Sequence, residues 1–356
     1  MKNCPIFKSI AILFCVVLFF ACQNNTTQFE HNPKKYHENI NRAELAICDS
    51  NYTEAAKYYK EAFQYLKEPF GIDLRNSLQC GLLANDKGVI DYCIPKYKER
   101  DYQLLVNLVC EDTKMWNYCD SLYKNSPVTS KIDTAYRAFL RQLEIDDQKV
   151  RIEIPENMSY TEVNSISWRV DSINMRKFQK YIDSTGIFPS ENIVGNSRNR
   201  AGSSILFDLI LIHYTGYVGI NNDYTHDRIN LHLEERVLAG EFHPELYAYL
   251  WDMRGYAMSG KLNNHEDRTD NFGAMLKIIR ETLKDTTTGQ LFEKETLFLP
   301  QHTEEEIKTI NKNRETIYLE PYEDFIKKAK YRISKMWDDD YYFSLTDDML
   351  YYIIVD

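Results

Sequence analysis

The sequence predicts a mainly α-helical protein in which a region of helical hairpins precedes a second helical domain. Two observations support this prediction. From residue 43 to residue 66, apolar side chains recur at spacings of three and four on both sides of a short polar break. Beyond residue 130 the helical spacing continues, whereas strand signals are few, chiefly at 150–154 and 351–355. We therefore expect a hairpin domain over 36–127 and a second domain over 128–356.

Residues 1–21 have the composition of a bacterial export signal. Lys2 and Lys8 precede an apolar run, 10–20, that is too short to span a bilayer. Ala21 stands directly before Cys22, so this segment resembles the signals of bacterial, Bacteroidetes-like lipoproteins. The resemblance implies that Cys22 becomes the first mature residue and carries diacylglycerol and acyl groups, with 22–35 as a flexible tether. The alternative is a single uncleaved membrane anchor.

Charge limits the partners of the chain. It has 43 Lys and Arg against 53 Asp and Glu, a formal net charge of -10. An acidic surface repels phosphate backbones, so no nucleic-acid partner is expected. The expected membrane contact is the lipid on Cys22, which places the protein in the cell envelope. Gln23 after that cysteine favours the outer membrane.

The first helices fit an antiparallel hairpin, because small residues at Ala43, Ala55 and Ala62 let two helix axes approach closely. Residues 51–63 resemble the second half of a tetratricopeptide repeat, and degenerate hairpins are expected over 74–94 and 104–123. The resemblance implies a groove for a protein or peptide partner. We expect contact residues at Tyr52, Tyr58, Tyr59 and Tyr65. An irregular helical bundle with one repeat-like hairpin is the alternative.

The second domain is expected to be helical throughout its centre. Gly186 and Pro189 end one helix, Pro244 begins another, and the spacing of Thr303 and Glu306 predicts a capping box. The predicted helices cover 135–150, 166–182, a fully buried 205–213, 231–238 ending at Gly240, 244–258, 272–283, a segment from 307 to 310, and 325–337 after Pro321. The segment 284–290 is expected to be irregular.

Residues 130–330 also resemble an uncharacterised bacterial envelope family. The elements that carry the resemblance are Asp147-Gln148 with Arg151, Asp171 with Asn174, Gly186, Pro189, Gly195, His213, Gly240, and Asn313-Arg314. Asp252, Arg254 and Phe272-Gly273 approximate further parts of the family pattern. The resemblance implies an architecture and no activity. The paired acids Asp146-Asp147 are expected to be solvated, as charge runs on helix surfaces usually are.

The cysteines beyond Cys22 lie in the hairpin region. Cys80 with Cys93, and Cys110 with Cys119, flank the turns of two hairpins, so an oxidising envelope permits two disulfides there. The alternative is that these cysteines, with Cys48, are small buried hydrophobic residues. No closely spaced cysteine pair of the kind that binds zinc occurs.

The histidines offer the candidate chemistry. His213 ends the most buried segment, where a polar side chain must find a partner, and His226 and His232 follow it. No His-Glu-x-x-His spacing, nucleophile elbow or phosphate-binding loop occurs, so no metal and no cofactor beyond the acyl groups is predicted. The leading hypothesis is a lipid-anchored, non-enzymatic protein-binding module. The alternative is an enzyme or metal-binding domain centred on His213.

Overall fold

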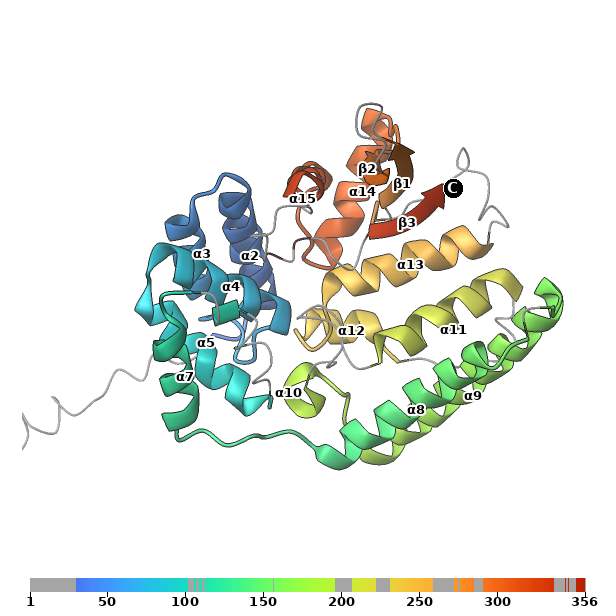
Figure 1. Cartoon of the computed structure of the whole chain (residues 1–356), viewed down its shortest axis with the longest axis horizontal. Coiled ribbons are helices and arrows are strands. Elements are labelled where there is room, and N and C mark those ends of the chain that lie inside the picture. The colour runs from blue at the N-terminus through green and yellow to red at the C-terminus, as the bar shows by residue number, and fades with distance from the viewer. Residues whose placement is uncertain are drawn as a thin grey trace, which may run out of the picture.

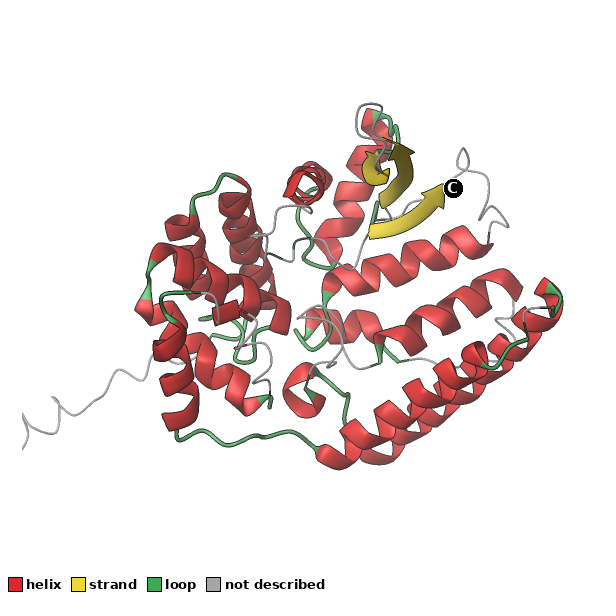
Figure 2. Cartoon of the chain, in the orientation of Figure 1, coloured by secondary structure: helices red, strands yellow, loops and turns green. Residues whose placement is uncertain are grey.

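The computed structural model describes residues 30–101, 106, 109–110, 113–155, 157–195, 207–221, 231–258, 272–274, 276–284, 291–335, 343, 345 and 350–355. Most of these residues are helical, and three strands form one small sheet (Figures 1 and 2). The predicted mainly α-helical class is confirmed. No helix in the described ranges has the length and apolar content needed to cross a membrane. The predicted export signal and Cys22 lie outside these ranges.

The N-terminal region is a stack of antiparallel helical hairpins. The first hairpin pairs α2 (Pro33–Cys48) with α3 (Tyr52–Ala62), the second pairs α4 (Gly71–Ala84) with α5 (Lys87–Glu99), and α7 (Trp116–Asn125) follows. Each helix packs against the next one in the stack. Ala43, Ala55 and Ala62 are fully buried where α2 and α3 meet, so the predicted small-residue contact is confirmed.

Two helix starts in this region follow from capping residues. Asn51 accepts a hydrogen bond from the backbone of α3, and Asp86 does the same for α5. The first helix, α2, begins at Pro33 with Asn32 as its cap, so it starts inside the segment predicted as tether, 22–35. The first described helix therefore begins three residues before the hairpin domain predicted from residue 36.

The second domain begins with a long helical hairpin. The hairpin consists of α8 (Thr134–Ile152) and α9 (Tyr160–Thr185). It is followed by α10 (Glu191–Val194), α11 (Asp208–Asn221), α12 (Leu233–Leu238) and α13 (Pro244–Met258). The α8–α9 hairpin packs along α11, and α11 packs in turn on α13 (Figure 1). Gly186, with φ of 67°, ends α9 in the left-handed conformation, as the sequence predicted.

A three-stranded sheet interrupts the helical pattern. Its strands are β1 (Leu276–Lys284), β2 (Leu291–Phe298) and β3 (Leu350–Val355), in the order β2-β1-β3. The β1–β2 pair is antiparallel, with Lys277 opposite Phe298, and the β1–β3 pair is parallel, with Ile278 opposite Tyr352. The predicted terminal strand at 351–355 is confirmed.

Two element predictions are wrong. The helix predicted over 272–283 is strand β1 from residue 276, because a short apolar run fits either period and the β-branched Ile278, Ile279 and Thr282 favour the strand. The strand predicted over 150–154 does not form: residues 150–152 belong to the last turn of α8, whose helical pattern continues through Asp147 and Arg151, and residues 153–154 are bends that follow it. The segment 285–290 lies outside the described residues.

The C-terminal helices return to the N-terminal hairpins. Helix α14 (Glu304–Thr316) begins at the predicted Thr303–Glu306 capping box, and α15 (Tyr322–Lys335) packs against α2 (Figure 1). Lys328 on α15 lies 2.6 Å from Glu44 of α2 and 2.7 Å from Glu320. Its ammonium is enclosed, so a buried ion-pair network joins the two regions.

Candidate functional site

Three helices of the second domain bring a histidine and two aspartates together. Asp147 comes from α8, Asp171 from α9 and His213 from α11, and one potential ligand atom of each lies within 4.8 Å of the others. The Nδ1 atom of His213 is 3.1 Å from Oδ1 and 3.0 Å from Oδ2 of Asp147. His213, the sharpest candidate from the sequence, is therefore paired with a carboxylate.

An arginine bridges the two aspartates. Arg151 lies one helical turn after Asp147 on α8, so both side chains share a face of that helix. Its Nη1 donates to Oδ1 of Asp147 at 2.8 Å and its Nη2 donates to Oδ1 of Asp171 at 2.6 Å. Gln148 Nε2 also donates to Asp147, at 2.7 Å. We call Asp147, Arg151, Asp171 and His213 the carboxylate–histidine cluster.

Burial within the cluster is graded. Asp147 is 0% exposed and Asp171 is 2% exposed. The side chains of His213 and Arg151 keep 24% and 23% of their surface exposed. The two carboxylates are thus enclosed, and the imidazole and the guanidinium are the parts of the cluster that a molecule from solvent can reach.

The environment separates the acidities of the two carboxyls. Burial raises the pKa of Asp171 to about 6, and the neighbouring Asp147 charge adds to this, while Arg151 opposes it. Burial also raises the pKa of Asp147, but the hydrogen bond and charge of His213, with Gln148 and Arg151, outweigh it and hold that pKa below its usual value. Asp147 is therefore the permanent anion, and Asp171 exchanges its proton near neutral pH.

The Asp147 contact determines which nitrogen of the neutral His213 ring carries the hydrogen. An ionised carboxylate only accepts hydrogen bonds, so Nδ1 is the donor. Nε2 is then the nitrogen that can accept a proton. This is the arrangement in which a carboxylate orients a catalytic histidine.

Asn174 fixes the α8–α9 hairpin beside the cluster. It lies one turn after Asp171, is 1% exposed, and its Nδ2 donates to the Leu143 carbonyl of α8 at 3.1 Å. Its Oδ1 is buried and has no hydrogen-bond partner among the described residues. Asn174 thus ties the two helices together at the depth where the aspartates lie.

Several polar residues of the family resemblance lie in two groups in space. Asp147, Gln148, Arg151, Asp171, Asn174 and His213 belong to the cluster and its support. The other group holds a loop before β1. Asp252 accepts from the backbone N–H groups of Phe272 at 3.1 Å and Ala274 at 2.8 Å, and Arg314 donates to the Phe272 carbonyl at 2.8 Å. The second group is structural, since these groups are buried and bonded to backbone.

The prediction that both paired acids are solvated is wrong for one of them. Asp146 lies at the surface and pairs with Lys177 at 3.1 Å. Asp147, the next residue, points into the protein. Neighbouring residues on a helix face about 100° apart, so one acid of a pair can be solvated while the other is enclosed.

The remaining histidine candidates do not join the cluster. His226 lies outside the described residues. His232 precedes α12 and its Nδ1 lies 3.1 Å from Glu235 Oε1, at an exposed position. The structure therefore combines His213 with two aspartates, which the sequence had not paired with it. The signal available in the sequence was the spacing of Asp147 and Arg151, together with the family pattern.

The candidate partner residues differ in accessibility. Tyr59 is 0% exposed, so its ring packs in the core and offers no surface to a partner. Tyr52 stacks on Phe343 from the C-terminal part of the chain, with ring centroids 5.7 Å apart. Tyr58 and Tyr65 are half-buried and lie under the cations of Arg42 and Lys35, respectively. Tyr52, Tyr58 and Tyr65 thus keep some exposed surface, whereas Tyr59 keeps none.

The four cysteines of the two predicted disulfides are buried, as expected under the alternative that they are small hydrophobic residues of the core. Cys80 on α4 and Cys93 on α5 are fully enclosed, and Cys93 Sγ lies 3.7 Å from Ser77 Oγ. Cys110 Sγ lies 2.7 Å from Cys119 Sγ. All are free thiols in the structure, as is Cys48. The disulfide between Cys110 and Cys119 stays a prediction, which the contact between their sulfur atoms favours.

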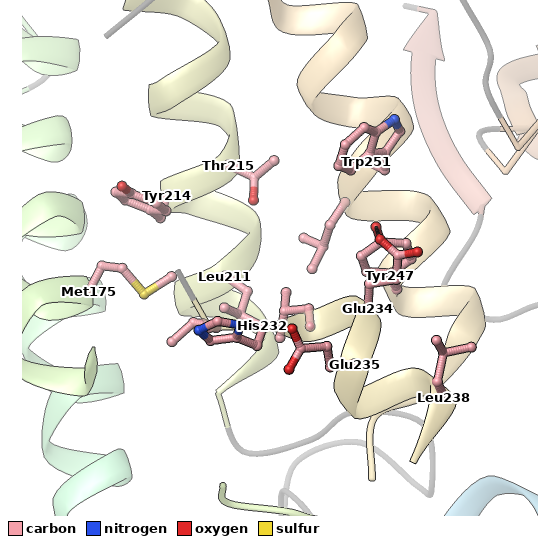
Figure 3. A pocket seen from close by; sticks show the side chains of 13 residues that line it. Met175, Leu211, Tyr214, Thr215, His232, Glu234, Glu235, Leu238, Tyr247 and Trp251 are labelled. Atoms are coloured by element: carbon pink, nitrogen blue, oxygen red, sulfur yellow. Dashed lines mark hydrogen bonds and ion pairs between the residues drawn. The ribbon is translucent and has the colours of Figure 1, made fainter. Parts of the chain in front are cut away.

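A cavity of about 560 Å³ opens beside the cluster, between α11, α12 and α13 (Figure 3). One of its lining residues, Met175, lies one helical turn from Asp171 on α9. The described lining is formed by Met175, Leu211, Tyr214, Thr215, Leu231, His232, Leu233, Glu234, Glu235, Leu238, Tyr247, Leu250 and Trp251.

Comparison with known proteins gives no relative. No family model, no curated protein and no solved structure matches this chain.

Proposed function

We propose that the second domain is an acid–base catalytic domain in which His213 transfers a proton and Asp147 orients it. The observation that carries this proposal is the contact of His213 Nδ1 with both oxygens of a fully buried carboxylate. A carboxylate in this position fixes the ring and stabilises the imidazolium that forms when Nε2 takes a proton.

The other two cluster residues set the charge of the site. With Asp147 ionised, Arg151 balances one negative charge, and the bridge to Asp171 holds the guanidinium in place. The site thus places a histidine beside one carboxylate whose pKa is held low and one carboxyl whose pKa is raised, a combination of titratable groups that general acid–base catalysis uses.

The reaction class that fits is removal of a proton from water or from a substrate hydroxyl, followed by its return to a leaving group. His213 would act as base and then as acid, since its side chain is 24% exposed and a substrate can reach it. Hydrolysis by an activated water is the simplest reaction of this class.

A bound divalent cation is the second candidate, because Asp147, Asp171 and His213 offer three ligand atoms in one place. Arg151 weighs against it. Its guanidinium contacts both carboxylates at 2.6 and 2.8 Å, so it already supplies the positive charge that a metal ion would bring.

The location that accompanies the proposal is the cell envelope, with the lipid on Cys22 as anchor. The composition of residues 1–22 supports it.

Partner binding by the hairpins has narrower support than the sequence suggested, because α15 packs on α2 and Phe343 stacks on Tyr52. Tyr58 and Tyr65 remain the candidate contacts. Crosslinking in the envelope should lose a stoichiometric partner in a Tyr58→Ala, Tyr65→Ala variant if the hairpins bind one.

The test of the catalytic proposal is a screen of the full mature chain against chromogenic esters, phosphate diesters and glycosides. His213→Ala and Asp147→Asn should each lower any activity found by at least about 100-fold, as is typical of general-base residues. His31→Ala, at an exposed position, is the control and should retain it. Metal content is measured on the same samples. Near-stoichiometric zinc that disappears in His213→Ala would replace the acid–base proposal with the metal candidate.

A further inference from the structure

The cavity beside the cluster combines aromatic rings with acidic side chains. Tyr214, Tyr247 and Trp251 contribute rings, and Glu234 and Glu235 contribute carboxylates. Among the described lining residues there is no lysine or arginine. The one histidine among these described lining residues is His232, and its ring contacts Glu235. The lining therefore combines aromatic rings and negative charge with aliphatic side chains, five of them leucines.

The rings and one carboxylate lie around a common space. The rings of Tyr247 and Trp251 on α13 lie 6.1 Å apart, and the Tyr247 hydroxyl is 3.4 Å from Glu234 Oε2. Figure 3 shows the Glu234 carboxylate on the same side of the cavity as Tyr247 and Trp251, across from Tyr214 and Thr215 of α11. Trp251 is 42% exposed, which is high for so large an apolar side chain. A ligand entering here meets ring surface and negative charge together.

This combination selects for the charge of the ligand. The face of an aromatic ring attracts a cation, and a nearby carboxylate adds a direct ionic attraction. A purely apolar ligand would displace water from the Glu234 carboxylate without offering it a new hydrogen bond or ion pair, and the carboxylate would repel an anion. The volume is within the range of small-molecule sites, and the net charge of -10 draws cations towards the protein.

We propose that this cavity binds an organic cation: an amine or quaternary ammonium group with an apolar part. The cationic group lies against Glu234 and the rings of Tyr247 and Trp251, and the apolar part lies against Leu211, Leu231 and Leu250. This proposal is independent of the acid–base chemistry at His213, because His213 is not among the lining residues.

The test uses three probes that share a benzyl or phenyl group: benzyltrimethylammonium, benzyl alcohol and benzoate. Each is titrated calorimetrically into the full mature chain at low ionic strength. The proposal predicts that the cation binds at least about tenfold more tightly than the other two, a difference of about 1.4 kcal/mol. Equal binding of all three probes, or tighter binding of benzoate, would overturn it.

Variants locate the binding. Glu234→Gln and Trp251→Leu should each remove most of the preference for the cation. Glu305→Gln, an exposed glutamate on α14, is the matched control and should bind like the wild type. If Glu234→Gln does not fold, as judged by circular dichroism, Glu235→Gln and the wild-type probe series still test the proposal. Retention of the full preference in the folded Glu234 and Trp251 variants would place the cation elsewhere and contradict the proposal. Calorimetric binding of a neutral disaccharide instead of the cation would also contradict it.

Discussion

Two of the clusters in which the described residues bury charged and titratable side chains differ in their access to solvent. Between the hairpins and the second domain, Lys328 is enclosed with Glu44 and Glu320, and His37 lies against His243 with ring centroids 6.0 Å apart. In the carboxylate–histidine cluster, two enclosed carboxylates lie beside a histidine that solvent can reach. The first arrangement joins two regions of the chain, whereas the second presents a reactive group.

The histidines make the contrast sharpest. Burial lowers the pKa of His37 to about 3, with the neighbouring His243 adding to the effect, and burial lowers the pKa of His243 to about 4. Both rings are therefore neutral packing elements beside Phe70. His213 instead has an ionised carboxylate as its partner. A histidine becomes a candidate for catalysis through its carboxylate partner and its access to solvent, and burial alone gives a structural residue.

The largest effect is expected from breaking the enclosed ion pairs. Lys328→Met removes this cation from the buried Glu44 and leaves Glu320 with Arg314 as its cation, so we expect it to lower the free energy of unfolding by about 3–5 kcal/mol. Urea denaturation measures this. Lys327→Met is the matched control, because Lys327 pairs with Asp49 at the exposed surface and should change stability by less than about 1 kcal/mol. Equal effects of the two variants would refute the structural role of Lys328.

A smaller effect is expected from the sulfur pair in the hairpin region. After export into an oxidising compartment, a disulfide-exchange oxidant should take two electrons and two protons from Cys110 and Cys119 and leave a disulfide. A bridge across so short a loop should contribute about 2–3 kcal/mol. Intact-mass measurement should show the chain about 2 Da lighter than its reduced form. A chain that retains free thiols at both positions after secretion would contradict this prediction.

The enclosed histidines should make the free energy of unfolding depend on pH. In the unfolded chain a histidine takes a proton near pH 6.5, whereas His37 and His243 resist protonation down to about pH 3 and 4. Their contribution is therefore complete above pH 6.5 and declines as the pH falls, by about 1–2 kcal/mol per histidine at pH 5. Asp171, whose pKa is raised, acts in the opposite direction over part of this range.

Variants separate these contributions. His37→Phe keeps an aromatic ring in the same contact and should flatten the decline in stability between pH 7 and pH 5 by about the share of one histidine. His31→Gln, at an exposed position, is the control. An unchanged slope in His37→Phe would show that this histidine does take up a proton in the folded protein.

The sequence revealed more of the fold than of the site. Helical spacing located nearly every described helix, and capping residues such as Thr303 and Gly186 marked their ends. It missed β1 and β2, since a run such as Leu276–Leu283 satisfies both periods until a partner strand is known. The contact of α15 with α2 joins residues far apart in the chain, and no local pattern encodes it.

The sequence identified only part of the site, for a similar reason. His213 stood out because a polar side chain ended an apolar helix, and that reasoning is specific to one segment. Its partner Asp147 looked like one acid of a solvated pair, and only the packing of α8 against α9 and α11 shows that it points inward. Pairing across three helices depends on tertiary structure, which spacing within one helix does not determine.

The most direct test of the central claim is the protonation of the His213 ring, measured by nitrogen-15 NMR on the full mature chain at a pH where the ring is neutral. The account predicts that Nδ1 carries the hydrogen and Nε2 carries none, and that Asp147→Asn abolishes this preference. A ring with its hydrogen on Nε2 would contradict the account, because the nitrogen proposed to accept the proton would already hold one.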